Sequence, residues 1–103
     1  MRVLVTGATG FVGGHLVPAL LAADHDVSVL VRDRDGYDGP DEVAVFEGDL
    51  LEPGSFDDAL EDIEAAYYLV HSMRAGADYA DRDRRAARTF VAAAEDAGVE
   101  HVV

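Results

Sequence analysis

The stretch RVLVTGATGFVG, residues 2–13, is the part of the sequence that best indicates the fold, because an apolar strand runs directly into a glycine-rich turn. Arg2–Thr6 has the apolar character of a buried strand. From residue 11 to residue 23, apolar side chains recur every three or four positions, as they do along one face of a helix. The turn between these two elements holds three glycines at a spacing of three: Gly7, Gly10 and Gly13.

This glycine spacing is typical of a turn that holds a phosphate. The first glycine permits a tight turn, the second lets the backbone approach a pyrophosphate, and the third lets the helix pack closely on the strand. The helix N-terminus adds unpaired N–H groups and a partial positive charge. A tight turn without a ligand is the alternative, but the strand and the helix on either side favour dinucleotide binding.

The rest of the chain continues the alternation of strand and helix patterns. Four further strands are expected, at residues 27–31, 43–46, 66–71 and 99–103, and a long helix at residues 79–97. Ser55, with Asp58 three residues later, has the spacing of a capping box and predicts a short helix. The alternation predicts an α/β fold of the Rossmann type. We expect a doubly wound parallel sheet of five strands, in the order 3-2-1-4-5, with helices on both faces.

The charge of the chain is strongly negative. It carries 21 acidic and 8 basic residues, a net charge of −13, and every one of those bases is an arginine. Such an excess of acid disfavours nucleic acid and anionic membranes as partners. An ordinary acidic surface is one interpretation. The absence of lysine favours a second, adaptation to high salt, in which screening limits the self-repulsion of a halophilic protein.

Composition also limits the class of protein. The sequence contains no cysteine, which excludes disulfides, thiolate metal sites and a cysteine nucleophile. No apolar run reaches the ~18 residues of a membrane span, and the N-terminus lacks a secretory pattern. We therefore expect one cytoplasmic domain, residues 1–103. Because the chain stops inside an apolar strand, we also expect it to be the N-terminal part of a longer protein.

The sequence VLVTGATGFVGGHL resembles the atypical and extended branches of the short-chain dehydrogenase/reductase superfamily, a group that includes sugar-nucleotide epimerases. The resemblance continues in VRD after the second strand, GDL after the third and YYLVHSM on the fourth. It implies an NAD(P)-binding domain, the cofactor half of an oxidoreductase or of an NAD-dependent epimerase/dehydratase. The implied partners are a dinucleotide cofactor and a small-molecule substrate, with a homo-oligomer left open.

The end of the second strand is expected to choose the cofactor. A carboxylate there binds the ribose 2′-hydroxyl of NAD, whereas an arginine accepts the 2′-phosphate of NADP. Arg32 follows the strand directly, and its guanidinium fork matches a phosphate. Asp33, 20 residues after Gly13, is the competing candidate for the ribose, and a solvated charged loop is the structural alternative. The sequence favours NADP over NAD.

Two further segments complete the expected site. In related proteins, the residues that match Asp49 and Leu50 bind the adenine, by a hydrogen bond from its amino group and by packing on the ring; a turn aspartate beside a core leucine is the alternative. His71 and Ser72 end the fourth strand beside the glycine turn, where they would contact ribose or substrate. The full expected cofactor-binding set is Gly7, Thr9, Gly10, Phe11, Val12, Gly13, Arg32, Asp33, Asp49, Leu50, His71 and Ser72.

No catalytic residue is predicted. The superfamily's usual catalytic pair is a tyrosine with a lysine four residues later, in which the lysine lowers the tyrosine pKa. The sequence has no lysine, so this pair cannot form within it. The four histidines lack metal-ligand spacing, and no metal site is expected. Two functions stay open: the cofactor half of an enzyme, or a non-catalytic NAD(P)H-binding module such as a redox sensor or an assembly subunit.

Overall fold

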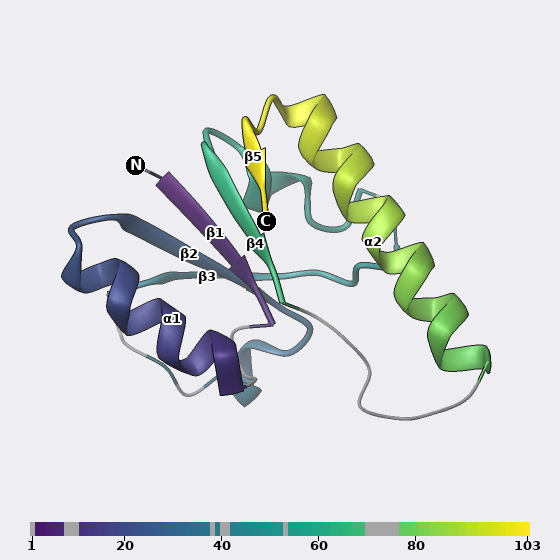
Figure 1. The fold of residues 1–103 in the computed structure, drawn as a ribbon, viewed down its shortest axis with the longest axis horizontal. Helices are drawn as coiled ribbons and strands as arrows, with labels where there is room; N and C mark the ends of the chain where they lie inside the picture. Colours follow the sequence, from purple (N-terminus) through teal and green to yellow (C-terminus); the bar gives the residue numbers. More distant parts are fainter. Residues whose placement is uncertain (1, 8–10, 38, 40–41, 53, 70–76) are drawn as a thin grey trace.

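The computed structural model of the chain describes residues 2–7, 11–37, 39, 42–52, 54–69 and 77–103. Five parallel strands form one sheet in the order β3-β2-β1-β4-β5 (Figure 1). The strands are β1 (Arg2–Thr6), β2 (Asp26–Val31), β3 (Ala44–Glu47), β4 (Ala65–Tyr68) and β5 (His101–Val102). The predicted strand order is therefore confirmed. The sheet reverses its winding between β1 and β4, which are direct neighbours.

Helices cover both faces of this sheet, as predicted (Figure 1). One face carries α1 (Phe11–Ala22) and the other carries α2 (Ala77–Ala97) together with the short 3-10 helix η2 (Asp57–Leu60). A second 3-10 helix, η1 (Arg34–Gly36), follows β2.

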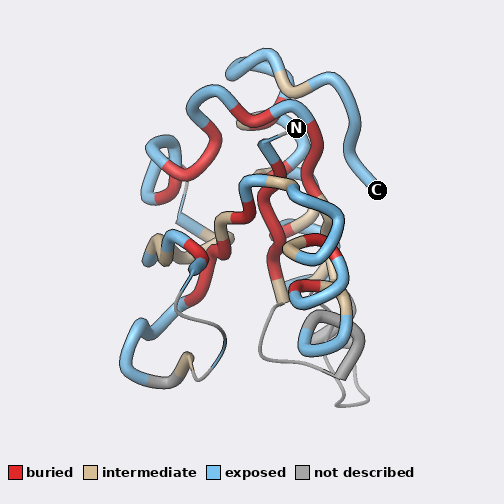
Figure 2. Tube along the Cα trace, turned by 90° about the vertical axis from the view of Figure 1, so that its left-hand side faces the viewer, coloured by how far each residue is buried: buried red, intermediate tan, exposed pale blue. Residues whose placement is uncertain are grey.

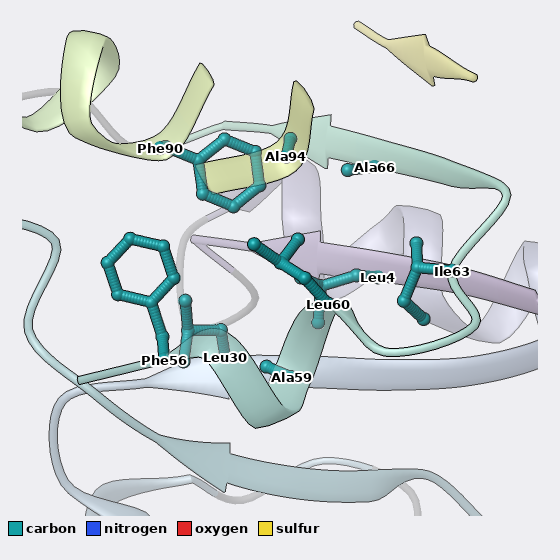
Figure 3. Close-up of a cluster of buried hydrophobic side chains, with 9 residues drawn as sticks. All are labelled: Leu4, Leu30, Phe56, Ala59, Leu60, Ile63, Ala66, Phe90 and Ala94. Atoms are coloured by element: carbon teal, nitrogen blue, oxygen red, sulfur yellow. The ribbon is translucent and has the colours of Figure 1, made fainter. Parts of the chain in front are cut away.

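The central strands β1 and β2 are buried on both faces, so that successive side chains enter two different cores. Val3 and Val5 pack on the α1 side with Val17, whereas Leu4 packs on the α2 side. Figure 2 shows the buried residues running through the centre of the trace. The α2-side core closes around Phe56 and Phe90 (Figure 3), whose ring centroids lie 6.0 Å apart. Burial of each such side chain contributes about 1.5–3 kcal/mol.

The predicted helix at residues 79–97 is present and starts two residues earlier, as α2. Its buried face is carried by Ala86, Phe90 and Ala94. Ala97, the last residue of the helix, is exposed and lines a groove between α2 and η2. Gly98 ends the helix at φ +82°. The N–H of Val99, one residue later, donates to the carbonyl of Ala94 at 3.0 Å, as in the Schellman motif.

The capping box predicted from Ser55 and Asp58 is wrong. The residue before η2 is Phe56, and no side chain caps this helix, which is a single 3-10 turn. The hydroxyl of Ser55 bonds the backbone of Asp49 instead, at 2.8 and 3.0 Å. Ser55 therefore ties the loop after β3 together, and the helix begins without a side-chain cap.

Candidate functional site

The candidate site lies at the carboxyl ends of β1, β2, β3 and β4, where the strand order reverses. Gly7 follows β1 with φ +73°, a left-handed backbone conformation that residues other than glycine adopt only at a cost in free energy. The backbone of residues 11–13 forms the first turn of α1, where the N–H groups have no carbonyl partner within the helix. Thr9 and Gly10 lie outside the described residues, as do the side chains of Phe11 and Val12.

Thr6, which the sequence analysis did not select, links two strands at this edge. It is fully buried. Its hydroxyl donates to the carbonyl of Tyr67 at 3.1 Å and accepts from the N–H of Leu69 at 3.3 Å. A threonine at the end of an otherwise apolar strand, directly before the first glycine, is the sequence signal that would have identified it. The bond joins the glycine turn to the end of β4.

The end of β2 places four charged residues, 32–35, in succession on one exposed turn. Arg32 is exposed and forms no hydrogen bond or ion pair with the rest of the described chain. Asp33 is engaged in the turn itself, because its Oδ1 accepts from the N–H of Asp35 at 3.0 Å and caps η1. The guanidinium of Arg34 donates to the carbonyl of Val45 at 3.0 Å.

The loop after β3 is held by its own hydrogen bonds. Oδ1 of Asp49 accepts from the N–H of Leu51 at 2.9 Å, while the backbone of Asp49 is tied to Ser55. Asp49 is half-buried, so that its carboxylate is both positioned and partly accessible. Leu50 is half-buried against the α2-side core. The turn role of Asp49 that the sequence left open is therefore present, and it leaves Oδ2 without a partner among the described residues.

Gly48, one residue before Asp49, is a second residue whose role the sequence did not reveal. A Cβ placed there would lie 2.8 Å from Cβ of Phe56 and 3.1 Å from the carbonyl oxygen of Ser55. The N–H of Gly48 donates to the carbonyl of Val31 at 3.0 Å. Close packing therefore requires glycine at this position and fixes the loop that carries Asp49.

Tyr68 ends β4 with its ring 5.3 Å from that of Phe90, centroid to centroid. Burial, and to a lesser degree the charge of Asp83, raises the pKa of the Tyr68 phenol. The phenol therefore stays protonated at neutral pH, which suits a packing role better than that of a general base. His71 and Ser72 follow this strand and lie outside the described residues.

The arginines of α2 belong to the surface of the helix. Arg84 and Arg85 lie 4.0 and 3.8 Å from the carboxylate of Asp81, and all three side chains are more than half exposed. The groove between α2 and η2 is lined by Leu60 and Ala93, beside the second half of α2 and away from the carboxyl ends of the strands.

Within the described part of the chain, no cluster of side chains is suited to a metal ion. None of the described helices combines the length and hydrophobicity that crossing a bilayer requires.

These residues fit a dinucleotide in the chemistry of their donors. A glycine turn leads into a helix N-terminus, which suits a pyrophosphate. At the end of β2 lies the guanidinium of Arg32, which has no partner among the described residues, and a partly accessible carboxylate follows β3.

Comparison with known proteins agrees with this fit. The sequence model of the NAD(P)H-binding family matches residues 7–103. Sterol demethylase protein B of Methylococcus capsulatus is 38% identical over 100% of this chain and 33% of its own length. Dihydroflavonol 4-reductase of Zea mays is 36% identical over 69% of this chain and 23% of its own length. The chain thus spans a third or less of these relatives.

Solved structures show the same fold. A short-chain dehydrogenase/reductase superfamily protein from Agrobacterium tumefaciens, solved with bound NAD, is 29% identical with a TM-score of 0.76, over 99% of this chain and 31% of that protein. A dTDP-glucose 4,6-dehydratase from Streptomyces venezuelae, also solved with NAD, is 25% identical with a TM-score of 0.81, over 99% and 38%. The chain belongs to the NAD(P)H-binding family, and the proteins that it resembles include a reductase, a dehydratase and a member of the short-chain dehydrogenase/reductase superfamily.

Proposed function

We propose that this chain binds NADP in preference to NAD, as the cofactor-binding part of a short-chain dehydrogenase-like oxidoreductase or nucleotide-sugar epimerase. The observation that carries the proposal is the turn after β2. Arg32 offers an exposed guanidinium without a described partner, whereas Oδ1 of Asp33 is engaged as the cap of η1. A guanidinium matches a 2′-phosphate, and the hydrogen bond within the turn leaves the carboxylate of Asp33 only partly available to a 2′-hydroxyl.

The other expected residues take the roles that the resemblance implies. The turn from Gly7 to Gly13 and the N-terminus of α1 hold the pyrophosphate, with Thr9, Gly10, Phe11 and Val12 between them. Asp49 and Leu50 receive the adenine, and His71 and Ser72 face ribose or substrate. The bound nicotinamide supplies the hydride, and this chain orients it.

Titration with NADPH and NADH, followed by nicotinamide fluorescence in molar salt, tests the cofactor preference. NADPH should bind more tightly, and Arg32→Asp should weaken NADPH more than NADH. An equal loss for both cofactors would remove Arg32 from the 2′-phosphate site. Gly10→Val, checked for an unchanged melting temperature, should abolish binding of both by blocking approach to the pyrophosphate. Retained affinity would mean that the glycine turn has no ligand role.

A second candidate is a binding module without turnover. The supporting observation is that the sequence has no lysine, so the pair Tyr-x-x-x-Lys cannot form within these 103 residues. Absorbance at 340 nm, followed with bound NADPH and a panel of ketones and nucleotide sugars, separates the two candidates. Oxidation of NADPH favours the enzyme, and binding without oxidation favours the module.

We also propose that the protein works in the cytoplasm at high ionic strength. The supporting features are the net charge of −13 and the absence of both lysine and cysteine. The salt dependence of stability, described below, is the measurement that checks it.

A further inference from the structure

The last residue of β3, Glu47, lies beside the turn after β2. In the sheet, Glu47 is the register partner of Val31, the residue directly before Arg32. Its Oε1 accepts from the backbone N–H of Arg34 at 3.1 Å. The same oxygen lies 3.9 Å from Nε of Arg34. A carboxylate therefore lies at the end of β3, beside the turn after β2 where the proposed function places the 2′-phosphate of the cofactor.

Arg34 holds a second contact on the same strand. Its Nη2 donates to the carbonyl of Val45 at 3.0 Å, so that the guanidinium lies along β3. Arg34 therefore differs from Arg32, which has no hydrogen bond or ion pair with the described residues. The two arginines have different roles: Arg32 is available to a ligand, and Arg34 is committed to Glu47 and β3.

The carboxylate of Glu47, without a positive charge beside it, would repel the 2′-phosphate of NADP and would not affect the 2′-hydroxyl of NAD. A single charge acting through water-exposed protein over several ångströms changes an equilibrium by roughly 3- to 10-fold. The positive charge of Arg34 offsets part of this repulsion, to an extent that depends on the exposure of the pair. The side chains of Arg34 and Glu47 are 61% and 52% exposed, so the offset is partial and depends on salt.

We propose that Glu47, offset by Arg34, is a specificity-determining residue that sets how strongly this site prefers a 2′-phosphate over a 2′-hydroxyl. This inference rests on the proposed dinucleotide site. It differs from a purely structural role for the pair, in which Arg34 and Glu47 only fasten the turn to β3. A structural fastening would affect NADPH and NADH alike, because both cofactors share the turn. An electrostatic role separates the two cofactors.

The test uses the dissociation constants of NADPH and NADH for the full chain, measured by nicotinamide fluorescence at 0.2 M and 2 M KCl. Glu47→Gln removes the charge and keeps the oxygen that accepts from Arg34. It should tighten NADPH binding about 3- to 10-fold at low salt, with NADH changed less than about 2-fold. Arg34→Gln should weaken NADPH by a similar factor, and the double variant should return the ratio toward that of the wild type.

Two further variants separate an electrostatic role of the Arg34–Glu47 pair from a purely structural one. Arg34→Lys keeps the positive charge and loses the planar fork, so it should preserve the preference for NADPH. Glu64→Gln removes an equal charge just before the amino end of β4, at the end of the sheet opposite the candidate site. It should leave the ratio of the NADPH and NADH dissociation constants unchanged. Each variant is first checked for an unchanged urea midpoint.

Failure of this inference and failure of the proposed function give different results. If the wild type binds both cofactors and Glu47→Gln shifts them equally or not at all, Glu47 does not set specificity. The same conclusion follows if Arg34→Lys behaves like Arg34→Gln. If the wild type binds neither cofactor, the proposed dinucleotide site is wrong, and so is the inference that rests on it. A wild type that prefers NADH overturns the NADP proposal alone, provided that Glu47→Gln still moves the ratio toward NADPH.

Discussion

The hydroxyl of Thr6 fastens β1 to Tyr67 of the neighbouring strand, donating to its carbonyl at 3.1 Å. The same oxygen accepts from the N–H of Leu69 at 3.3 Å, just past the end of β4. These bonds lie at the two carboxyl ends that meet where the strand order reverses, and the ligand of a doubly wound sheet binds at that point. One buried side chain therefore sets the spacing between the glycine turn and the segment after β4.

Replacement of Thr6 tests this link. Thr6→Val keeps the shape of the side chain and removes both hydrogen bonds inside a buried site, which should cost about 1–3 kcal/mol in the free energy of unfolding. Thr6→Ser keeps the hydroxyl and should retain most of the stability. Urea denaturation of the three proteins measures the difference. Equal midpoints for the valine and serine variants would show that the hydroxyl bonds do not stabilise the fold.

The packing around Gly48 gives a second prediction. The Cβ of Gly48→Ala would lie 2.8 Å from Cβ of Phe56, a fully buried residue that has little room to move. Overpacking of this kind costs typically about 1–3 kcal/mol, and the displaced loop should also weaken the binding of dinucleotide beside Asp49.

Gly14 provides the matched control for this substitution. It lies within α1 and is exposed, and a Cβ added to it would meet nothing within 4 Å apart from the helix itself. Gly14→Ala should therefore raise stability by up to about 1 kcal/mol through helix propensity. Thermal denaturation of both variants gives the comparison. The packing argument fails if Gly48→Ala melts at or above the temperature of the wild type.

The fold could be predicted from the sequence because its signals are local. Apolar runs such as residues 2–6 and the glycine turn identify a parallel sheet without any knowledge of distant contacts. Ser55 shows where local reasoning stops. Its spacing to Asp58 matches a capping box, but its hydroxyl bonds Asp49, six residues earlier. The choice depends on how the loop after β3 folds over η2, which no short pattern encodes.

The residues of the candidate site also differ in how far the sequence alone could identify them. Gly7 and Arg32 could be selected from the motif and from the chemistry of their side chains. The roles of Thr6 and Glu47 are harder to predict, because each acts through a partner on another strand or turn: Tyr67 in one case and Arg34 in the other. For Thr6 the only signal is its place between an apolar strand and the first glycine, and Glu47 carries no such signal. Such pairs come from the register of the sheet.

The raised pKa of Tyr68 predicts how stability changes at alkaline pH. Burial first, and the charge of Asp83 second, hold the phenol protonated in the folded state above its usual value of 10.0. A folded pKa above the unfolded one means that the unfolded chain loses its proton first. The contribution is therefore fully present below about pH 10 and is lost as the pH rises through the folded pKa.

Urea midpoints at pH 8, 10 and 11 check this sign, with Tyr68→Phe as the comparison. The phenylalanine variant should lose less stability between pH 10 and pH 11 than the wild type. Some loss should remain, because burial also raises the pKa of Tyr37. A variant that follows the wild type at every pH would show that Tyr68 does not contribute to the alkaline transition.

The charge of the chain predicts that salt stabilises it. At a net charge of −13, the folded state is subject to self-repulsion, and the screening length falls from about 10 Å at 0.1 M salt to about 3 Å at 1 M. The melting temperature should therefore rise between 0.1 M and 2 M KCl. General effects of salt on hydrophobic burial would also raise it, so a charge variant is needed.

Three exposed carboxylates around η2 supply that variant. Asp57→Asn, Asp58→Asn and Glu61→Gln, combined, remove three charges without breaking a side-chain ion pair within the described chain. This triple variant should melt higher than the wild type at 0.1 M KCl and gain less from added salt, because less repulsion is left to screen. If its salt dependence matches that of the wild type, self-repulsion is not what salt relieves, and the acidic surface is not an adaptation to high ionic strength.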